Sequence, residues 1–348
     1  MIETGQGLDA LEAWRSTYDA AVAASPDIDP FCSRSDWMIS FARSHAPDLD
    51  VFVARRGDSH LALSRTDHDE LGPLWHALEH GWRFASPIAG PGSEHLLLDL
   101  LAGEGRTLRP GHSLGTSGGS LDGERDGSDL SHGSVLISGL DPGPRLMHLL
   151  MHLQGNHEIY RLPSTGRVVA SLQGGLDGYL SRRSRELRRN LRRAGRRARD
   201  RGLHIERLVL DDRADVDALY GRVLEVESRS WKALEHMGAD REPMRGFYHH
   251  LLHRLRVEGR ARLLLAHLEG DHVGYMHGGQ CGDHFRSFQF SYDDARAELS
   301  IGNLLHLELV TWLCEDGVQH YDLGQQVPYK RHWGEGLRTT PNLLVVPR

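Results

Sequence analysis

The densest cluster of charge in the chain is the run from Arg182 to Arg201, which holds eleven arginines against two acidic residues. This run carries about nine net positive charges in a chain whose formal net charge is −7. Its apolar residues recur at i, i+4, i+7 and i+11, namely Leu187, Leu191, Ala194 and Ala198. The spacing predicts a helix with one narrow apolar stripe and arginines over the rest of its surface. The fold must therefore supply an apolar surface that buries the stripe.

Two interpretations of this arginine-rich helix fit its composition. Basic helices that face solvent are typical of proteins that bind nucleic acid or an anionic membrane. Alternatively, the stripe packs on a domain and the aliphatic stems of the arginines cover apolar surface. Because organised sequence lies on both sides of the helix, we interpret it as a seam between two lobes. We expect the stripe to pack on the second lobe, with the arginines facing outward or bordering its cleft, and we disfavour nucleic acid as the partner.

The length and composition of the chain limit the class of protein. A chain of 348 residues predicts two domains of ordinary size. No apolar run approaches the roughly 18 residues that a membrane span needs, and the first residues lack the basic and apolar regions of a secretory signal. Cys32, Cys281 and Cys314 lie far apart and match no metal or redox spacing. We therefore expect a cytoplasmic protein with no disulfides and no bound metal.

Lysine is nearly absent from the chain, and its two positions are informative. The sequence holds 39 arginines but only Lys232 and Lys330, each of which follows an aromatic residue. A position that remains lysine against such a bias favours a compact charge with an adjustable pKa. Both positions are therefore candidates for a functional role.

The second half of the chain shows a regular alternation of elements. We expect a strand, two helices, three strands joined by tight turns, a buried helix, a strand, a short helix and a last strand. The strands and the last helices fall at Leu203–Leu210, Arg262–Leu268, His272–Gln280, His284–Tyr292, Ile301–Cys314, Val318–Leu323, Tyr329–Trp333 and Leu337–Val346. The order predicts a mixed α+β sheet with a helical crossover late in the chain.

The first half gives a looser version of the same pattern. We expect two helices, a hairpin, a third helix and short strands. The hairpin strands fall at Asp50–Arg56 and His60–Arg65, the third helix at Leu71–His80, and two of the short strands at Glu158–Leu162 and Val168–Leu172. Gly103–Gly133 is rich in glycine and serine and predicts a surface loop or insertion. Ser113 in this loop fits a Gly-x-Ser-x-Gly motif, but the strand and helix that the motif requires are missing.

Histidine pairs at helical spacing raise the question of a metal site. His148 and His152 are four residues apart, and His249, His250 and His253 lie close together on a second helix. No acidic or cysteine partner stands beside them in the sequence, so we assign both groups to structural helix faces.

The start of the predicted buried helix and the strand before it are the clearest candidates for a binding site. Ser300 can cap this helix, while Gly302 and Asn303 leave little side chain at its first turn. Free N–H groups and the helix dipole there suit a pyrophosphate, although a plain capped helix fits equally well. In the preceding strand, Gln289 and Ser291 share a polar face that lines a cleft or faces solvent.

Four blocks of the second half together resemble the GNAT acyltransferase superfamily, and more specifically its CelD-like branch, which is similar to the FemAB peptidyltransferases. These blocks are Val169–Gly202, Glu227–Lys232, Tyr292–Leu305 and Gly317–Trp333. The resemblance covers about residues 165–340. It departs from the family at the pyrophosphate loop, where residues 298–303 replace the usual Q/R-x-x-G-x-G/A pattern.

The resemblance implies an α+β fold of two GNAT-like lobes, each a mixed, mostly antiparallel sheet flanked by helices. Residues 1–164 would form a degenerate first lobe, 165–202 a connecting strand and arginine-rich helix, and 203–348 the acyltransferase lobe. The implied reaction moves an acyl group from acyl-CoA, acetyl or longer, to an amine of a small molecule or peptide, without a metal. Alternatives are a FemAB-like enzyme that uses aminoacyl-tRNA and a non-catalytic module that binds acyl-CoA or a partner. An acyl carrier protein or acidic peptide could dock on Arg182–Arg201.

Direct attack of an amine on a thioester needs a base, a group that polarises the carbonyl and an acid for the leaving thiolate. We predict the catalytic residues to be Glu227, Asp322, Tyr329 and Lys330, with Asp322 or Glu227 as the base, Tyr329 as the acid and Lys330 as a phosphate or carboxylate anchor. The donor would be held by Gln289, Ser291, Ser300, Ile301, Gly302 and Asn303. Substrate would contact Trp231, Lys232, Tyr292 and Trp333.

Overall fold

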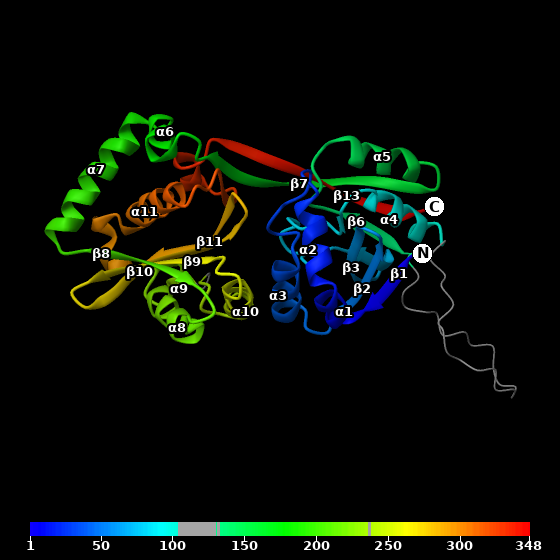
Figure 1. The fold of residues 1–348 in the computed structure, drawn as a ribbon, viewed down its shortest axis with the longest axis horizontal. Coiled ribbons are helices and arrows are strands. Elements are labelled where there is room, and N and C mark those ends of the chain that lie inside the picture. The colour runs from blue at the N-terminus through cyan, green and yellow to red at the C-terminus, as the bar shows by residue number, and fades with distance from the viewer. Residues whose placement is uncertain (104–129, 131–132, 236–237) are drawn as a thin grey trace, which may run out of the picture. The chain divides into compact units, whose positions relative to one another are not determined.

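The computed structural model describes residues 1–103, 130, 133–235 and 238–348, and their contacts divide the chain into two compact units. The first unit comprises residues 1–42, 48–165 and 340–348, and the second comprises 43–47 and 166–339 (Figure 1). Most of the Gly103–Gly133 loop, with Ser113, lies outside the described residues. Within the part of the chain that is described, no helix is long and apolar enough to cross a membrane.

The first unit is a mostly antiparallel sheet with helices packed on it. Its strands follow the order β1-β2-β3-β4-β6-β13-β7, with β5 beside β3 and with β4 and β6 as the parallel pair. These strands are β1 (Glu3–Gln6), β2 (Asp50–Arg56), β3 (Ser59–His68), β4 (Gly72–His76), β5 (Ile88–Ala89), β6 (Ser134–Ile137), β7 (His157–Ser171) and β13 (Gly336–Pro347). The helices are α1 (Gly7–Ala13), α2 (Arg15–Ala23), α3 (Ser35–His45), α4 (Ser93–Leu101) and α5 (Pro144–Leu153).

Some of the elements predicted for the first half are wrong. The helix predicted at Leu71–His80 is instead β4, whose residues pair with β3 on one side and β6 on the other. The two short strands predicted at Glu158–Leu162 and Val168–Leu172 are one long strand, β7, which continues from the first unit into the second. The predicted hairpin is confirmed as β2 and β3.

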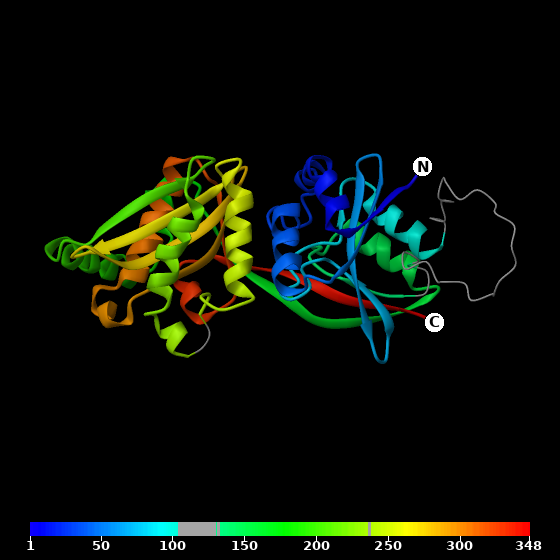
Figure 2. The ribbon, with the colours of Figure 1, turned by 90° about the horizontal axis from the view of Figure 1, so that it is seen from below.

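The second unit is a sheet of order β7-β12-β11-β10-β9-β8, covered by helices on both faces. Its strands are β8 (His204–Leu210), β9 (Ala261–Leu268), β10 (Asp271–Cys281), β11 (His284–Tyr292) and β12 (His320–Gln325). Helices α6 (Gly175–Ser181), α7 (Arg185–Asp200) and α11 (Ile301–Glu315) lie on one face. Helices α8 (Val216–Glu227), α9 (Trp231–Leu234) and α10 (Met244–Arg256) lie on the other, toward the viewer of Figure 2. The predicted α+β class, with a mostly antiparallel sheet and flanking helices, is confirmed.

The arginine-rich helix α7 packs as its sequence predicts. Ser184 caps it by accepting a 3.1 Å hydrogen bond from the backbone N–H of Leu187. The buried residues of the helix are the four of the apolar stripe. Leu187 and Leu191 join the main core of the second unit, while Ala194 and Ala198 pack with Leu304 of α11.

The two units group three segments, residues 43–47, 166–202 and 340–348, differently from the predicted domain boundaries. Residues 166–202 belong to the second unit because the stripe of α7 is part of its core. Residues 340–348 belong to the first unit because the end of β13 pairs with β6.

Candidate functional site

The parallel strands β11 and β12 separate soon after they meet. They pair at His284–His320, Phe285–Tyr321 and Arg286–Asp322, and no later pair joins them in the described part of the chain. From Ser287 onward, backbone N–H and C=O groups of β11 on this side lack a β12 partner. Such an open strand edge can hydrogen-bond an extended ligand.

A pocket of about 580 Å³ opens where the two strands separate. Its wall combines the start of α7, α9, the end of β11, the first turn of α11 and the short 3-10 helix η3 (Pro328–His332). The lining residues are Ser184, Glu186, Leu187, Asn190, Trp231, Lys232, Phe290, Ser291, Tyr292, Ala297, Ser300, Gly302, Asn303, His306, Tyr329, His332 and Trp333. Nine of the fourteen residues predicted for the site are in this list.

The first turn of α11 forms one edge of the pocket, but the predicted cap is wrong. Ser300 adopts the left-handed conformation, with φ of 59°, and its side chain makes no capping hydrogen bond. Instead its Oγ accepts a long hydrogen bond of 3.5 Å from Arg197 Nη2 of α7. The helix start therefore keeps free N–H groups and the positive end of its dipole beside an arginine, which suits an anion.

Gly302 and Ile301 occupy opposite sides of this turn. A Cβ at Gly302 would lie 2.9 Å from Phe290 Cε2 and 3.2 Å from Tyr292 Cε1, so a side chain there would crowd the pocket wall. Ile301 is fully buried and lies against Gly274 of β10 rather than in the pocket. Its predicted role in holding the donor is therefore limited to its backbone.

His306 of α11 lines the pocket and was not predicted from the sequence. Its Nδ1 lies 3.2 Å from the hydroxyl of Tyr321, whereas its buried Nε2 has no hydrogen-bond partner. Burial, with a smaller effect of the Lys330 charge, lowers the pKa of His306 to about 3, so the imidazole is neutral. The ring stacks on Trp333 with centroids 4.8 Å apart. His306 is one of a few polar residues in a mostly apolar helix, and this was the sequence signal that could have identified it.

The tautomer of His306 follows from the groups behind it. Burial raises the pKa of Tyr321 well above its ordinary value, and a hydrogen bond from Ser287 lowers it. A Tyr321 O–H that donates to Nδ1 leaves the ring proton on Nε2. The resulting Nε2–H is buried without a partner, on a residue that lines the pocket. Ser291 Oγ, also buried and without a partner, lines the same pocket.

Both lysines lie at or beside the pocket. Lys232 lines it, with Nζ donating to the carbonyl oxygen of Phe290 and, at 3.2 Å, to Gln289 Oε1. Burial lowers the pKa of Lys232. Lys330 does not line the pocket, and its Nζ donates to the carbonyl oxygen of Gln325 at 3.1 Å. Burial, together with the nearby Arg286 charge, lowers the pKa of Lys330 to about 8.

The two predicted bases lie outside the pocket, and their oxygens are occupied. Glu227 is fully buried, and its two oxygens accept hydrogen bonds from Tyr275 Oη at 2.8 Å and from the N–H of Ala239 at 2.9 Å. Asp322 Oδ2 lies 2.9 Å from nitrogens of both Arg167 and Arg286. Its Oδ1 accepts the N–H of Gly324 at 2.7 Å. These contacts favour structural rather than proton-transfer roles.

The aromatic residues predicted for the site surround the pocket. Tyr329 is 40% exposed, with its ring centroid 5.4 Å from that of Phe290 and 6.2 Å from that of His306. Trp333 is buried, and its carbonyl oxygen accepts the Tyr179 hydroxyl at 2.7 Å. Trp231 and Tyr292 complete the lining. Gln289 does not line it but contacts it through Lys232.

Residues 185–331, from the start of α7 to η3, match the family model described as an acetyltransferase (GNAT) domain. This segment, 147 of the 348 residues, is therefore similar to GNAT-type acetyltransferase domains. All the lining residues except Ser184, His332 and Trp333 fall within the match. The pocket, the separated strands and the N-terminus of α11 therefore lie almost entirely within the segment that matches the GNAT model.

Solved structures with the same fold cover nearly the whole chain. The structure of FemX matches with a TM-score of 0.65 and 12% identity over 94% of this chain and 95% of its own. A conserved protein of unknown function from Bacteroides thetaiotaomicron matches with a TM-score of 0.62 and 11% identity over 99% and 100%. The C-terminal domain of a lysylphosphatidylglycerol synthetase from Agrobacterium fabrum matches with a TM-score of 0.54 and 13% identity, over 94% of this chain and 92% of its own. No curated protein matches. At these identities the similarity establishes the fold alone.

Proposed function

We propose that the chain is an acyltransferase that moves an acyl group from acyl-CoA to the amine of a small molecule or peptide. The observation that carries this proposal is the pocket where β11 and β12 separate, with the first turn of α11 at its edge. One end offers N–H groups and positive charge for a pyrophosphate. The strand edge offers hydrogen-bonding groups for the amides of a pantetheine chain. The match of residues 185–331 to the GNAT acetyltransferase model supports this assignment.

In the proposed ternary complex, the amine nitrogen attacks the thioester carbon and negative charge develops on the carbonyl oxygen. His306 Nε2–H is the buried, unpartnered donor that stabilises this oxygen. As the C–N bond forms and the C–S bond breaks, Tyr329 Oη gives its proton to the leaving thiolate. Burial raises the pKa of Tyr329, which keeps the phenol protonated before this step.

The proton of the attacking amine needs an acceptor other than Glu227 and Asp322. Glu186 is the one carboxylate among the described residues that line the pocket. It lies in the first turn of α7 and is exposed, so it can hold the acceptor's ammonium group at the pocket mouth. We assign the proton to Glu186 or to water that it orders.

Release of free CoA thiol tests the proposed reaction. Purified protein is mixed with acetyl-CoA or a long-chain acyl-CoA and with a panel of primary amines, and thiol is measured with a chromogenic disulfide. We expect thiol release that depends on both the protein and the amine. Saturable binding of acyl-CoA without any thiol release would instead indicate a non-catalytic binding module.

The arginines of α7 suit two alternative donors, an aminoacyl-tRNA and an acidic carrier protein. None of the nine arginines from Arg185 to Arg201 has a carboxylate within ion-pair distance among the described residues, although Arg182 and Arg183 both pair with Glu335. Helix α7 borders the pocket through Glu186, Leu187 and Asn190, and Arg197 reaches Ser300 Oγ at the pocket edge. A FemAB-like peptidyltransferase that takes aminoacyl-tRNA, or an enzyme that takes its acyl group from an acidic carrier protein, would use these arginines. Binding of tRNA that weakens steeply with salt, without binding of CoA, would support the first of these.

The pH dependence of donor binding tests the role of Lys330. With a pKa of about 8, Lys330 is a cation below pH 8 and neutral above it. If it anchors a phosphate or carboxylate of the donor, the KM for the donor should rise as pH increases through 8. Lys330→Arg should keep its charge and carry the low KM to higher pH. KM profiles of wild type and variant that rise at the same pH would contradict this role.

A further inference from the structure

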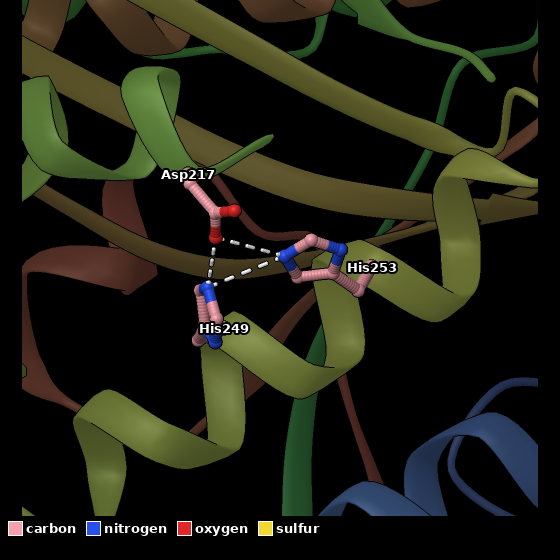
Figure 3. Close-up of side chains that lie close together, drawn as sticks. All are labelled: Asp217, His249 and His253. Carbon is pink, nitrogen blue, oxygen red and sulfur yellow. Dashed lines mark hydrogen bonds and ion pairs between the residues drawn. The ribbon is translucent and has the colours of Figure 1, made fainter. Parts of the chain in front are cut away.

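A second group of polar side chains lies between helices α8 and α10 of the second unit, away from the pocket. His249 and His253 are one turn apart on α10, so both rings emerge from the same face of that helix. Asp217, in the first turn of α8, points toward them from the neighbouring helix (Figure 3). No acidic residue stands near the two histidines in the sequence, which by itself predicts only a structural helix face. The structure supplies an acidic partner from 32 residues earlier.

Three potential ligand atoms of this group converge on one point. Asp217 Oδ1 lies 2.6 Å from His249 Nε2 and 3.1 Å from His253 Nε2, and the two Nε2 atoms are 3.2 Å apart (Figure 3). Both imidazoles thus present the same nitrogen to the same carboxylate oxygen. Two N–H groups donating to that oxygen account for two of the contacts. The close approach of the two nitrogens to each other remains without a hydrogen bond, because each then carries its own proton.

The separations fit a small cation better than a hydrogen-bonded cluster. Zn²⁺ binds imidazole nitrogen and carboxylate oxygen at roughly 2.0–2.2 Å in a tetrahedron, which places neighbouring ligand atoms about 3.3 Å apart. Two of the three observed separations are within about 0.2 Å of that value. The third needs the Asp217 carboxylate to move outward by less than an ångström, which its 72% exposed side chain allows.

We propose that Asp217, His249 and His253 form a binding site for a divalent transition-metal ion of the Zn²⁺ class. Two imidazoles and one carboxylate are typical ligands for such ions, whereas Ca²⁺ and Mg²⁺ prefer oxygen ligands. The side chains are partly exposed, with His249 at 37% and His253 at 32%, so an ion can enter and water can complete its coordination. The proposal goes beyond the acyltransfer reaction and does not depend on it.

A bound ion would cross-link helices α8 and α10. α8 and α10 pack on the same face of the sheet, where the Tyr220 hydroxyl also donates to the carbonyl oxygen of Arg245 at 3.1 Å. An ion held by one ligand from α8 and two from α10 adds a second connection, which exists only in the folded state. Binding should therefore raise the stability of the second unit.

Metal titration of the full-length chain tests the site. The protein is prepared without a polyhistidine tag, dialysed against EDTA and then titrated with ZnCl₂ by calorimetry near neutral pH, where most imidazoles are neutral. We expect saturable binding that is lost in His249→Ala/His253→Ala and weakened at least tenfold in Asp217→Asn. We also expect a rise in Tm of roughly 5 °C at a Zn²⁺ concentration about 100-fold above Kd. Bound Co²⁺ should show the strong visible absorption of a tetrahedral site.

Two control variants separate this site from other histidines. His250→Ala removes the neighbouring ring on α10 and should leave binding unchanged. A second group, Asp283, His284 and His320, is less convergent, with Asp283 Oδ2 3.8 Å from His320 Nε2, and His284→Ala/His320→Ala tests it. Unchanged circular dichroism shows that each variant is folded. If the double histidine variant does not fold, Asp217→Asn, a change at an exposed residue, still tests the site. Absence of Zn²⁺ binding in the wild type, or binding and Tm shift retained in Asp217→Asn and the double variant, would overturn the proposal.

Discussion

Replacing His306 with phenylalanine should lower kcat for thiol release by about 10²–10³-fold and leave the Kd for acyl-CoA nearly unchanged. Nε2 is buried without a hydrogen-bond partner beside the pocket, and in the proposed mechanism its N–H stabilises the oxygen on which charge develops. Phenylalanine keeps the aromatic packing against Trp333 and Phe290 but offers no donor. The loss should therefore fall on the chemical step rather than on folding or donor binding.

The measurement compares kcat from thiol release with Kd from calorimetry for wild type and variant. His306→Gln provides the matched control, because its amide can place an N–H donor near the position of Nε2 and should recover part of the rate. Tyr321→Phe should have a smaller effect, since it removes only the group that fixes the tautomer at Nδ1. Equal kcat in wild type and His306→Phe would remove His306 from the mechanism.

The parts of the fold that the sequence predicts correctly are those in which local pattern and tertiary environment agree. The stripe of α7 has a strict helical period and is the set of residues that the core buries. The turns at Gly270 and Gly282 adopt positive φ, as expected where a hairpin reverses between β9, β10 and β11. In both places the decisive information lies within a few residues of the chain.

The wrong predictions come from positions where distant segments decide the conformation. Leu71, Leu74 and Leu78 have helical spacing, yet Gly72–His76 pairs with strands on both sides and becomes β4. Ser300 is a favourable cap residue, but its left-handed backbone turns the side chain away from the N–H groups of α11. Neither the strand partners of β4 nor the backbone angle at Ser300 can be read from the neighbouring sequence.

The candidate site shows the same division between local and distant information. Strand alternation for Ser291 and the family blocks for Gly302, Asn303 and Tyr329 point to residues that line one pocket, although their roles stay predictions. The sequence does not reveal which residues donate hydrogen bonds to a given carboxylate. Asp322 meets Arg167, a residue 155 positions earlier, and this contact changes its expected role. The sequence predicts α11 only as a buried helix and so does not single out His306. In the structure, His306 Nε2 is a buried polar atom without a hydrogen-bond partner, which is uncommon in folded proteins and indicates a candidate site.

Replacing Asp322 with asparagine should therefore destabilise the protein by about 3–5 kcal/mol. Asp322 Oδ2 is paired with Arg167 and Arg286, whose side chains are each only 4% exposed. Removing its charge leaves two guanidinium groups buried without this compensating carboxylate. The free energy of unfolding is measured by urea denaturation of wild type and variant. Glu315→Gln, which breaks the exposed pair with Arg207, is the matched control and should change stability by less than about 1 kcal/mol.

The same variant decides between the two roles considered for Asp322. If Asp322 is the general base, the Asp322→Asn variant should lose most of its turnover while its free energy of unfolding stays nearly unchanged. If the Asp322 carboxylate is structural, the variant should lose stability. The molecules that remain folded at low temperature should then keep much of the wild-type turnover. The thiol-release rate per folded molecule, compared with the urea midpoint, separates these outcomes. A variant with wild-type stability and little turnover would support Asp322 as the base. Because two buried arginines pair with Asp322, we expect instead a less stable variant that keeps turnover per folded molecule.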